Sequence, residues 1–89
     1  MNTKYDMIIM DIFQSALIPE KFQTQEFIDV LNTRLHDKGI LLFNRMAISD
    51  RDERENKQFR KLFKTNYPEM AELKIKDNLV FVNNSKLIS

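Results

Sequence analysis

The first side chain in the sequence that could do chemistry is Asp11, which directly follows the apolar run Met7–Met10. A run without alternation predicts a strand covered on both faces, as in a parallel sheet. Ligands of such sheets bind beyond the carboxyl ends of the strands, where a carboxylate can hold a cation or accept a proton. We expect Ile12, Phe13 and Gln14 to line the same site. On the residues alone, capping of the next turn is the favoured role for Asp11, and loop packing suits Phe13 and Gln14 at least as well.

Other polar residues have weaker claims to a chemical role. Asn44 follows a second apolar run and could contact a ligand, but stabilisation of a turn is the favoured interpretation. His36 is expected to be a surface residue near a helix C-terminus. The charge run Arg51–Lys57 is expected to be a solvated helix face. With no cysteine and a single histidine, the chain predicts neither a disulfide nor a metal cofactor.

Composition limits the classes of protein to consider. The 89 residues, 43% apolar and 30% charged, predict one small globular domain. Fourteen basic and thirteen acidic residues give a net charge of +1, so we expect neither nucleic acid nor an anionic membrane as partner. The longest apolar run is too short to span a bilayer, and no secretory signal is visible, so we expect a cytoplasmic protein. A single glycine excludes phosphate-binding glycine loops.

Local patterns predict the elements that must position these residues. Thr24 is a suitable helix N-cap, and Phe27, Ile28, Leu31 and Leu35 recur at helical spacing. Gly39 stands where a left-handed helix cap belongs, with Arg34, His36 and Lys38 near the end of that helix. Ser49 or Asp50 can cap a second helix, and Asp77-Asn78 suits a two-residue hairpin turn. The expected elements are a strand at 5–13, a helix at 25–37, a strand at 40–45, a helix at 50–66 and a hairpin at 70–83.

This order of elements predicts the fold class. Alternating strands and helices indicate an α/β protein with a mostly parallel sheet of about four strands, two helices and a C-terminal antiparallel hairpin. A doubly wound sheet needs helices on both faces, and the first strand needs a neighbour on its other side. Residues 1–89 are therefore expected to form a single partial α/β domain, half of a larger fold.

Four segments in register resemble the C-terminal half of spermidine synthase-like proteins, which have the class I methyltransferase-like, Rossmann-like fold. They are Tyr5–Phe13, Pro19, Thr24–Phe27 and Gly39–Asn44. The resemblance implies that the strands are the fourth to seventh of a seven-stranded sheet. It further implies that the seventh is antiparallel and lies between the fifth and the sixth.

The resemblance also implies a chemistry. The family transfers an aminopropyl group from decarboxylated S-adenosylmethionine to an amine, and its strand-end carboxylate corresponds to Asp11. The family's second acidic residue, three positions later, is Gln14 here, which removes one amine-binding charge. The strands that bind S-adenosylmethionine or its decarboxylated form have no counterpart in the chain. We therefore expect the chain to bind no cofactor and to be inactive alone.

A non-catalytic interaction module that keeps the fold is the alternative function. In either case the Met7–Phe13 strand lacks a neighbour on one side, and its apolar run contains no charge, proline or bulge to protect the edge. We expect this edge to pair with a second copy of the chain, or with the missing N-terminal half of the larger fold.

Overall fold

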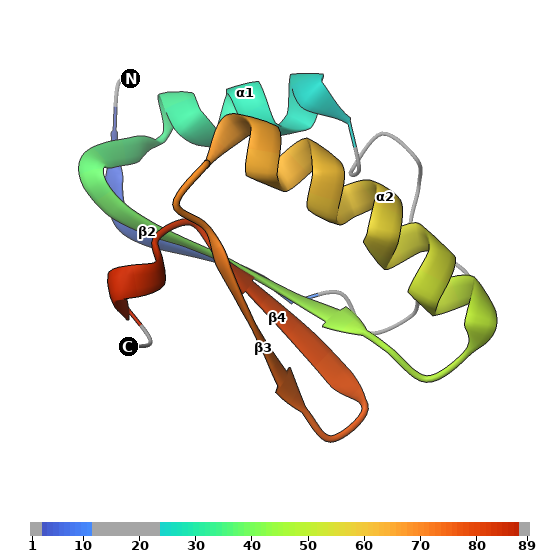
Figure 1. Ribbon diagram of the computed structural model, residues 1–89. Coiled ribbons are helices and arrows are strands. Elements are labelled where there is room, and N and C mark those ends of the chain that lie inside the picture. Colours follow the sequence, from blue (N-terminus) through green and yellow to red (C-terminus); the bar gives the residue numbers. More distant parts are fainter. Residues whose placement is uncertain (1–2, 12–23, 88–89) are drawn as a thin grey trace.

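The computed structural model describes residues 3–11 and 24–87, which form four strands and two α-helices (Figure 1). A short 3-10 helix, η3, follows the last strand at Ser85–Leu87. The elements, in chain order, are β1 Tyr5–Asp11, α1 Gln25–Thr33, β2 Leu35–Met46, α2 Asp50–Asn66, β3 Ala71–Ile75 and β4 Asn78–Val82. The expected α/β class with four strands and two helices is confirmed. Residues 12 and 13 of the expected first strand lie outside the described residues.

The strands form one mixed sheet in the order β1-β2-β4-β3. β1 and β2 are parallel, whereas β4 is antiparallel to both of its neighbours, β2 and β3. The last strand therefore lies between the second and the third, which confirms the placement that the resemblance implied. Both α-helices lie side by side on the same face of this sheet (Figure 1).

Four phenylalanines join α2 to the sheet. Phe43 of β2 and Phe81 of β4 are paired neighbours in the sheet, and both are fully buried. Phe59 of α2 lies between them, with ring centroids 4.9 Å from Phe43 and 5.2 Å from Phe81. Phe63, one turn further along α2, stacks on Phe59 at 5.5 Å. Each ring removes a large apolar surface from water, so this cluster stabilises the packing of α2 on the sheet.

The expected helix at 25–37 is too long. α1 ends at Thr33, with Arg34 as its C-cap, and β2 starts at Leu35. His36 and Lys38 therefore lie in β2 and not at the end of a helix. Leu35 continues the apolar stripe of α1, which explains the expectation, but it is instead paired with Tyr5 of β1. Sheet pairing and burial of Leu35 outweigh the helical spacing.

Gly39 is not the left-handed helix cap that its position suggested. It lies within β2, and no described glycine has a positive φ. The reason for a glycine is space: a Cβ atom there would come within 2.5 Å of Leu35 Cδ1 and 3.0 Å of the His36 carbonyl oxygen. The residue lets the buried Leu35 side chain lie against the backbone of its own strand.

The hairpin turn is one residue earlier than expected. Ile75 pairs with Asn78, so the two turn residues are Lys76 and Asp77, not Asp77 and Asn78. Lys76 has a φ of 52°, the only positive value among the described non-glycine residues. A left-handed lysine is unfavourable in itself. The ladder on either side of the turn evidently compensates for it.

The amide of Asn83 extends the sheet beyond the end of β4. Its Oδ1 accepts a hydrogen bond from the Leu41 N–H, and its Nδ2 donates to the Gly39 carbonyl, both at 3.0 Å. The side chain thus occupies the place of a strand backbone next to β2. This contact keeps the amino end of β2 paired where the hairpin has ended.

We expect Gly39→Ala to lower the free energy of unfolding by about 1–3 kcal/mol, because the added methyl group must displace buried Leu35. Urea unfolding followed by circular dichroism measures the change. Lys38→Ala, at the exposed neighbouring position, is the control and should stay within about 0.5 kcal/mol of the parent. An equally stable Gly39→Ala variant would contradict the steric explanation.

Candidate functional site

Asp11 and Asn44 form a polar pair at the carboxyl ends of the two parallel strands. They are register partners in β1 and β2, and Asn44 Nδ2 donates a hydrogen bond of 3.1 Å to Asp11 Oδ1. Asp11 is exposed, whereas Asn44 is half-buried. The bond orients one oxygen of the exposed carboxylate. The sequence favours a turn-stabilising role for Asn44. In the structure Asn44 is instead a hydrogen-bond partner of Asp11, the predicted site residue.

The other polar side-chain atom of Asn44, the acceptor Oδ1, has a different environment. Asn44 Oδ1 is buried and has no hydrogen-bond partner among the described residues. A buried acceptor without a partner costs about 1–3 kcal/mol, so such atoms are uncommon in folded proteins. The exposed Asp11 carboxylate offers acceptor oxygens, which suit a ligand that carries N–H donors or a positive charge.

The alternation of side chains along the strands decides which face this pair occupies. Phe43 points toward the helices, so Asn44 points to the opposite face of the sheet. Its partner Asp11 shares that face. The predicted substrate-binding residues Ile12, Phe13 and Gln14 lie outside the described residues.

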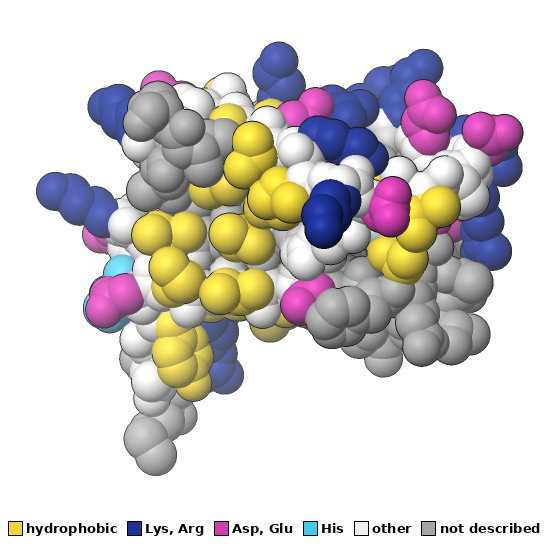
Figure 2. All heavy atoms as spheres, turned by 90° about the horizontal axis from the view of Figure 1, so that it is seen from below, with side chains coloured by type: hydrophobic (Ala, Val, Ile, Leu, Met, Phe, Trp, Pro, Cys, Tyr) yellow, Lys and Arg dark blue, Asp and Glu magenta, His cyan; other side chains and the backbone are white. Residues whose placement is uncertain are grey.

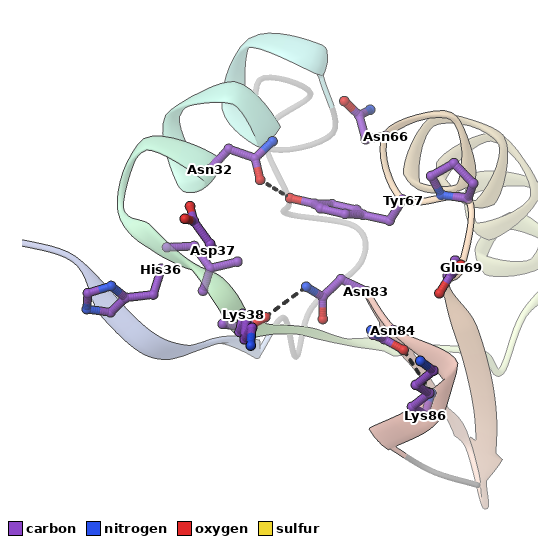
Figure 3. Close-up of a pocket in the computed structure, with 13 residues that line it drawn as sticks. Asn32, His36, Asp37, Lys38, Asn66, Tyr67, Glu69, Asn83, Asn84 and Lys86 are labelled. Atoms are coloured by element: carbon purple, nitrogen blue, oxygen red, sulfur yellow. Dashed lines mark hydrogen bonds between the residues drawn. The ribbon is translucent and has the colours of Figure 1, made fainter.

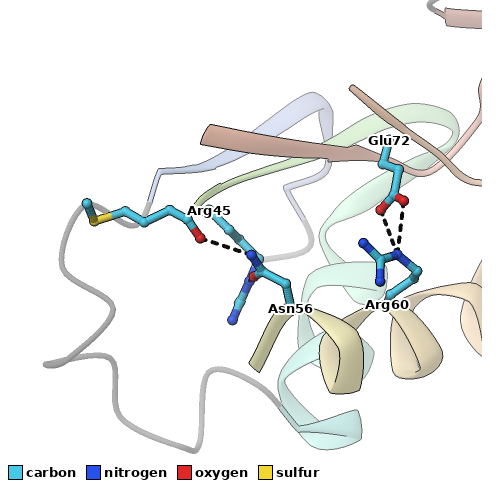
Figure 4. A network of polar contacts seen from close by, with 5 residues as sticks. Arg45, Asn56, Arg60 and Glu72 are labelled. Atoms are coloured by element: carbon cyan, nitrogen blue, oxygen red, sulfur yellow. Dashed lines mark hydrogen bonds and ion pairs between the residues drawn. The ribbon is translucent and has the colours of Figure 1, made fainter. Parts of the chain in front are cut away.

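A buried polar cluster lies on the helix side of the same strand end (Figure 4). Arg45 Nε donates to Asn56 Oδ1 at 2.7 Å, and Asn56 Nδ2 donates to the Met46 carbonyl at 2.9 Å. The guanidinium lies 4.4 Å from the centre of the Phe59 ring. Burial lowers the pKa of Arg45 from its ordinary value, while the nearby carboxylates of Glu55 and Asp52 oppose that shift.

This cluster corrects the expectation that Arg51–Lys57 is a solvated helix face. Asp52 and Asn56 are buried, with exposed fractions of 4% and 3%. Asp52 accepts hydrogen bonds from the backbone N–H groups of Ile48 and Ser49, while Ser49 caps the helix in return. The sequence did contain the signal, because the stripe of Phe59 and Phe63 continues backwards at helical spacing onto these two polar residues.

His36 and the hollows of the surface lie apart from the Asp11–Asn44 pair. The exposed His36 Nε2 is 3.8 Å from Asp6 Oδ1, a weak surface contact. A hollow of about 800 Å³ at the amino end of β2 is lined by polar residues such as Asn32, Tyr67 and Asn83 (Figure 3). A smaller one of about 380 Å³ lies beside the start of α2. Neither is lined by Asp11 or Asn44.

The described residues contain neither a cluster of metal-binding side chains nor a helix suited to cross a membrane. Residues 3–11 and 24–87 hold no group of three or more histidine or acidic side chains placed to bind a metal ion. Within the same ranges, no helix combines the length and the apolar content that crossing a membrane requires.

Comparison with known proteins adds one relative. A polyamine aminopropyltransferase of Vibrio vulnificus is 33% identical over 60 residues. The match covers 67% of this chain but 20% of that protein, in its C-terminal part. The chain thus spans about a fifth of the length of the relative it matches. No protein-family model and no solved structure matches. The match supports a loose, spermidine synthase-like relationship.

Tyr67, which lines the larger hollow, gives a prediction about pH. Its hydroxyl donates to Asn32 Oδ1, and burial is the main cause that raises its pKa. The folded state therefore holds the phenol proton to higher pH than the unfolded chain. This contribution to stability is complete below about pH 10 and is lost as the pH rises through the folded-state value.

We expect Tyr67→Phe to lower the free energy of unfolding by about 1 kcal/mol at neutral pH through loss of this hydrogen bond. Above about pH 10, the difference between parent and variant should shrink, because only the parent loses the tyrosine contribution. Urea unfolding from pH 7 to 11 measures both curves. A difference that stays constant over this range would contradict the assignment.

Proposed function

We propose that this chain is the C-terminal part of a spermidine synthase-like transferase with a class I methyltransferase-like fold, and that Asp11 binds the amine acceptor. The observation that carries the proposal is the Asp11–Asn44 pair at the carboxyl ends of two parallel strands. This is where α/β sheets bind their ligands. Similarity to the C-terminal part of a polyamine aminopropyltransferase supports the same assignment.

The strand order supports the proposed fold. An antiparallel last strand between the second and third strands is the arrangement expected for strands four to seven of a methyltransferase-like sheet. In that assignment, the outer side of β1 is where the remaining strands of the larger sheet would pair. β1 is the first strand in the sheet order and has one partner, β2, among the described strands.

Asp11 would act on the acceptor amine, whose nitrogen is the nucleophile. An alkylamine with a pKa of about 10 is protonated at neutral pH and cannot attack carbon. The Asp11 carboxylate would bind the ammonium group, orient it and accept the proton that the nitrogen must lose. Asn44 would hold the carboxylate in place through the hydrogen bond from its Nδ2.

This chain by itself would not provide a binding site for the aminopropyl donor, S-adenosylmethionine or its decarboxylated form. Its sole glycine, Gly39, is packed against Leu35 within β2, so it provides no loop whose backbone could approach a ligand. We therefore assign the binding of S-adenosylmethionine or its decarboxylated form to the remainder of the larger protein. This chain would supply the acceptor wall of the crevice.

We expect isothermal titration calorimetry to show no saturable binding of either donor to the 89-residue chain up to high micromolar concentration. The physical reason is the lack of a donor site on these elements. A clear signal at low micromolar concentration would contradict the proposal that the chain is one part of a two-part site.

Activity is tested in a chimera in which the matched segment of the Vibrio vulnificus polyamine aminopropyltransferase is replaced by the corresponding residues of this chain. If Asp11 is the positioned base, Asp11→Asn should reduce turnover by about 100-fold or more. The amide keeps the size of the carboxylate and can still accept from Asn44 Nδ2, so the fold is preserved.

Asp77→Asn in the hairpin turn is the matched control, since it makes the same chemical change away from the pair. It should leave turnover unchanged. If the Asp11→Asn chimera is as active as this control, Asp11 is not the base, and capping of a turn remains its role. A folded chimera that binds donor but has no activity before any further substitution would overturn the proposed function.

The second candidate function is a non-catalytic module that associates with copies of itself. The observation in its favour is a set of exposed apolar side chains on two strands at opposite sides of the sheet: Met7, Ile9, Leu73 and Ile75. Sedimentation of the chain at tens of micromolar distinguishes an associating module from a monomer.

A further inference from the structure

Asn44 lies where β2 loses one of its two neighbouring strands. β1 ends at Asp11, the register partner of Asn44, so Arg45 and Met46 pair with β4 and with no other described strand. A strand end with fewer backbone hydrogen bonds opens more easily than the middle of a sheet. The direction of the Asn44 side chain therefore depends on what else holds the last residues of β2.

Asn56 of α2 contacts both of the residues that follow Asn44. Its Oδ1 accepts a hydrogen bond of 2.7 Å from Arg45 Nε, and its Nδ2 donates one of 2.9 Å to the Met46 carbonyl (Figure 4). Asn56 is 3% exposed, so water competes little for either bond. One buried amide thus holds a side chain and a backbone group at the end of β2.

The contact with Arg45 determines where Asn44 points. Consecutive side chains of a strand lie on opposite faces of the sheet. Arg45 is buried on the helix face, 4.4 Å from the centre of the Phe59 ring, and Phe43 packs against the same ring at 4.9 Å. Both neighbours of Asn44 are thus held by α2. Asn44 therefore points to the opposite face, over which hydrophobic side chains gather (Figure 2), and there it donates to Asp11.

We propose that Asn56 is a positioning residue of the candidate site. Its contacts with Arg45 and Met46 hold the end of β2 so that Asn44 keeps its hydrogen bond to Asp11. Groups in a binding site keep a precise geometry when neighbouring hydrogen bonds fix the side chains that orient them. The importance of Asn56 for amine transfer rests on the proposed function. The arrangement of the Asp11–Asn44 pair does not, and it can be measured without activity.

Solvent exchange of the Asn44 Nδ2 protons, measured by NMR, reports on the pair in the 89-residue chain. We expect slower exchange in the parent than in Asp11→Ala, which removes the acceptor. Asn56→Ala should raise the exchange rate by about fivefold or more, the effect of losing one hydrogen bond. Asn56→Asp keeps an acceptor for Arg45 but sets an oxygen against the Met46 carbonyl, so it should raise the rate while Arg45 stays paired.

Asn66→Ala is the matched control, because it removes the same kind of side chain from the other end of α2. Asn66 Nδ2 donates to the Leu62 carbonyl at 2.8 Å. This variant should be less stable than the parent but should leave the Asn44 exchange rate unchanged, and circular dichroism should show that every variant is folded. If the Asn56 variants keep the parent rate, or if Asn66→Ala raises it equally, Asn56 has a structural role only and the proposal is wrong.

Turnover tests the same residue in a chimera of the Vibrio vulnificus enzyme that carries residues 5–66 of this chain. Asn56→Asp should lower turnover by about fivefold and leave the KM of the donor unchanged. In an Asn44→Ala background, Asn56→Asp should have no further effect, because the contact through which it acts is absent. An equal effect in both backgrounds would overturn the positioning role. Full turnover of Asp11→Asn would instead overturn the proposed function and leave the exchange result in place.

Discussion

The contact of α2 with the sheet through four phenylalanine rings determines the placement of nearly everything else. Phe43 must face α2 to reach Phe59 and Phe63. Because strand side chains alternate, Asn44 is then forced to the opposite face and Arg45 back to the helix face. The polar pair with Asp11 and the buried Arg45–Asn56 contact are two consequences of this one constraint.

The same constraint explains why the molecule has two unlike faces. Among the described residues, the aromatic rings that pack together lie on the helix side, where the buried Arg45 guanidinium lies over the Phe59 ring. The other face keeps aliphatic side chains and a single carboxylate–amide pair. The Asp11–Asn44 pair and the uncovered aliphatic side chains therefore lie on the same face of the sheet. A partner that covers this face also comes close to the candidate site.

Much of the fold could be predicted from the sequence, because apolar runs and cap residues are local signals. The second helix, for example, starts after a Ser49 cap and ends before Pro68, and both signals are in the sequence. The end of α1 could not be predicted, since Leu35 fits the helical stripe and only its pairing with β1 decides otherwise. The pair Asp77-Asn78 suits a two-residue turn, whereas the ladder register places the turn at Lys76 and Asp77, with Lys76 at positive φ.

In the candidate site, too, some residues could be predicted from local patterns and others could not. Asp11 could be singled out because a strand-end carboxylate is a local pattern. Its contact with Asn44 requires the register of two strands, which no local pattern gives. Asn56 belongs to a charge run that is typical of a solvated helix face, because its burial depends on where the aromatic rings of α2 dock.

The amide of Asn83 has a consequence for the chemical ageing of the protein. Asparagine is among the thermolabile residues, and hydrolysis of its side-chain amide leaves a carboxylate. At this position the product would keep an acceptor for the Leu41 N–H but would set a second oxygen against the Gly39 carbonyl, where a donor now stands at 3.0 Å. Deamidation of Asn83 would thus replace the hydrogen bond to the Gly39 carbonyl with repulsion between two oxygens. This change would weaken the contact between Asn83 and β2.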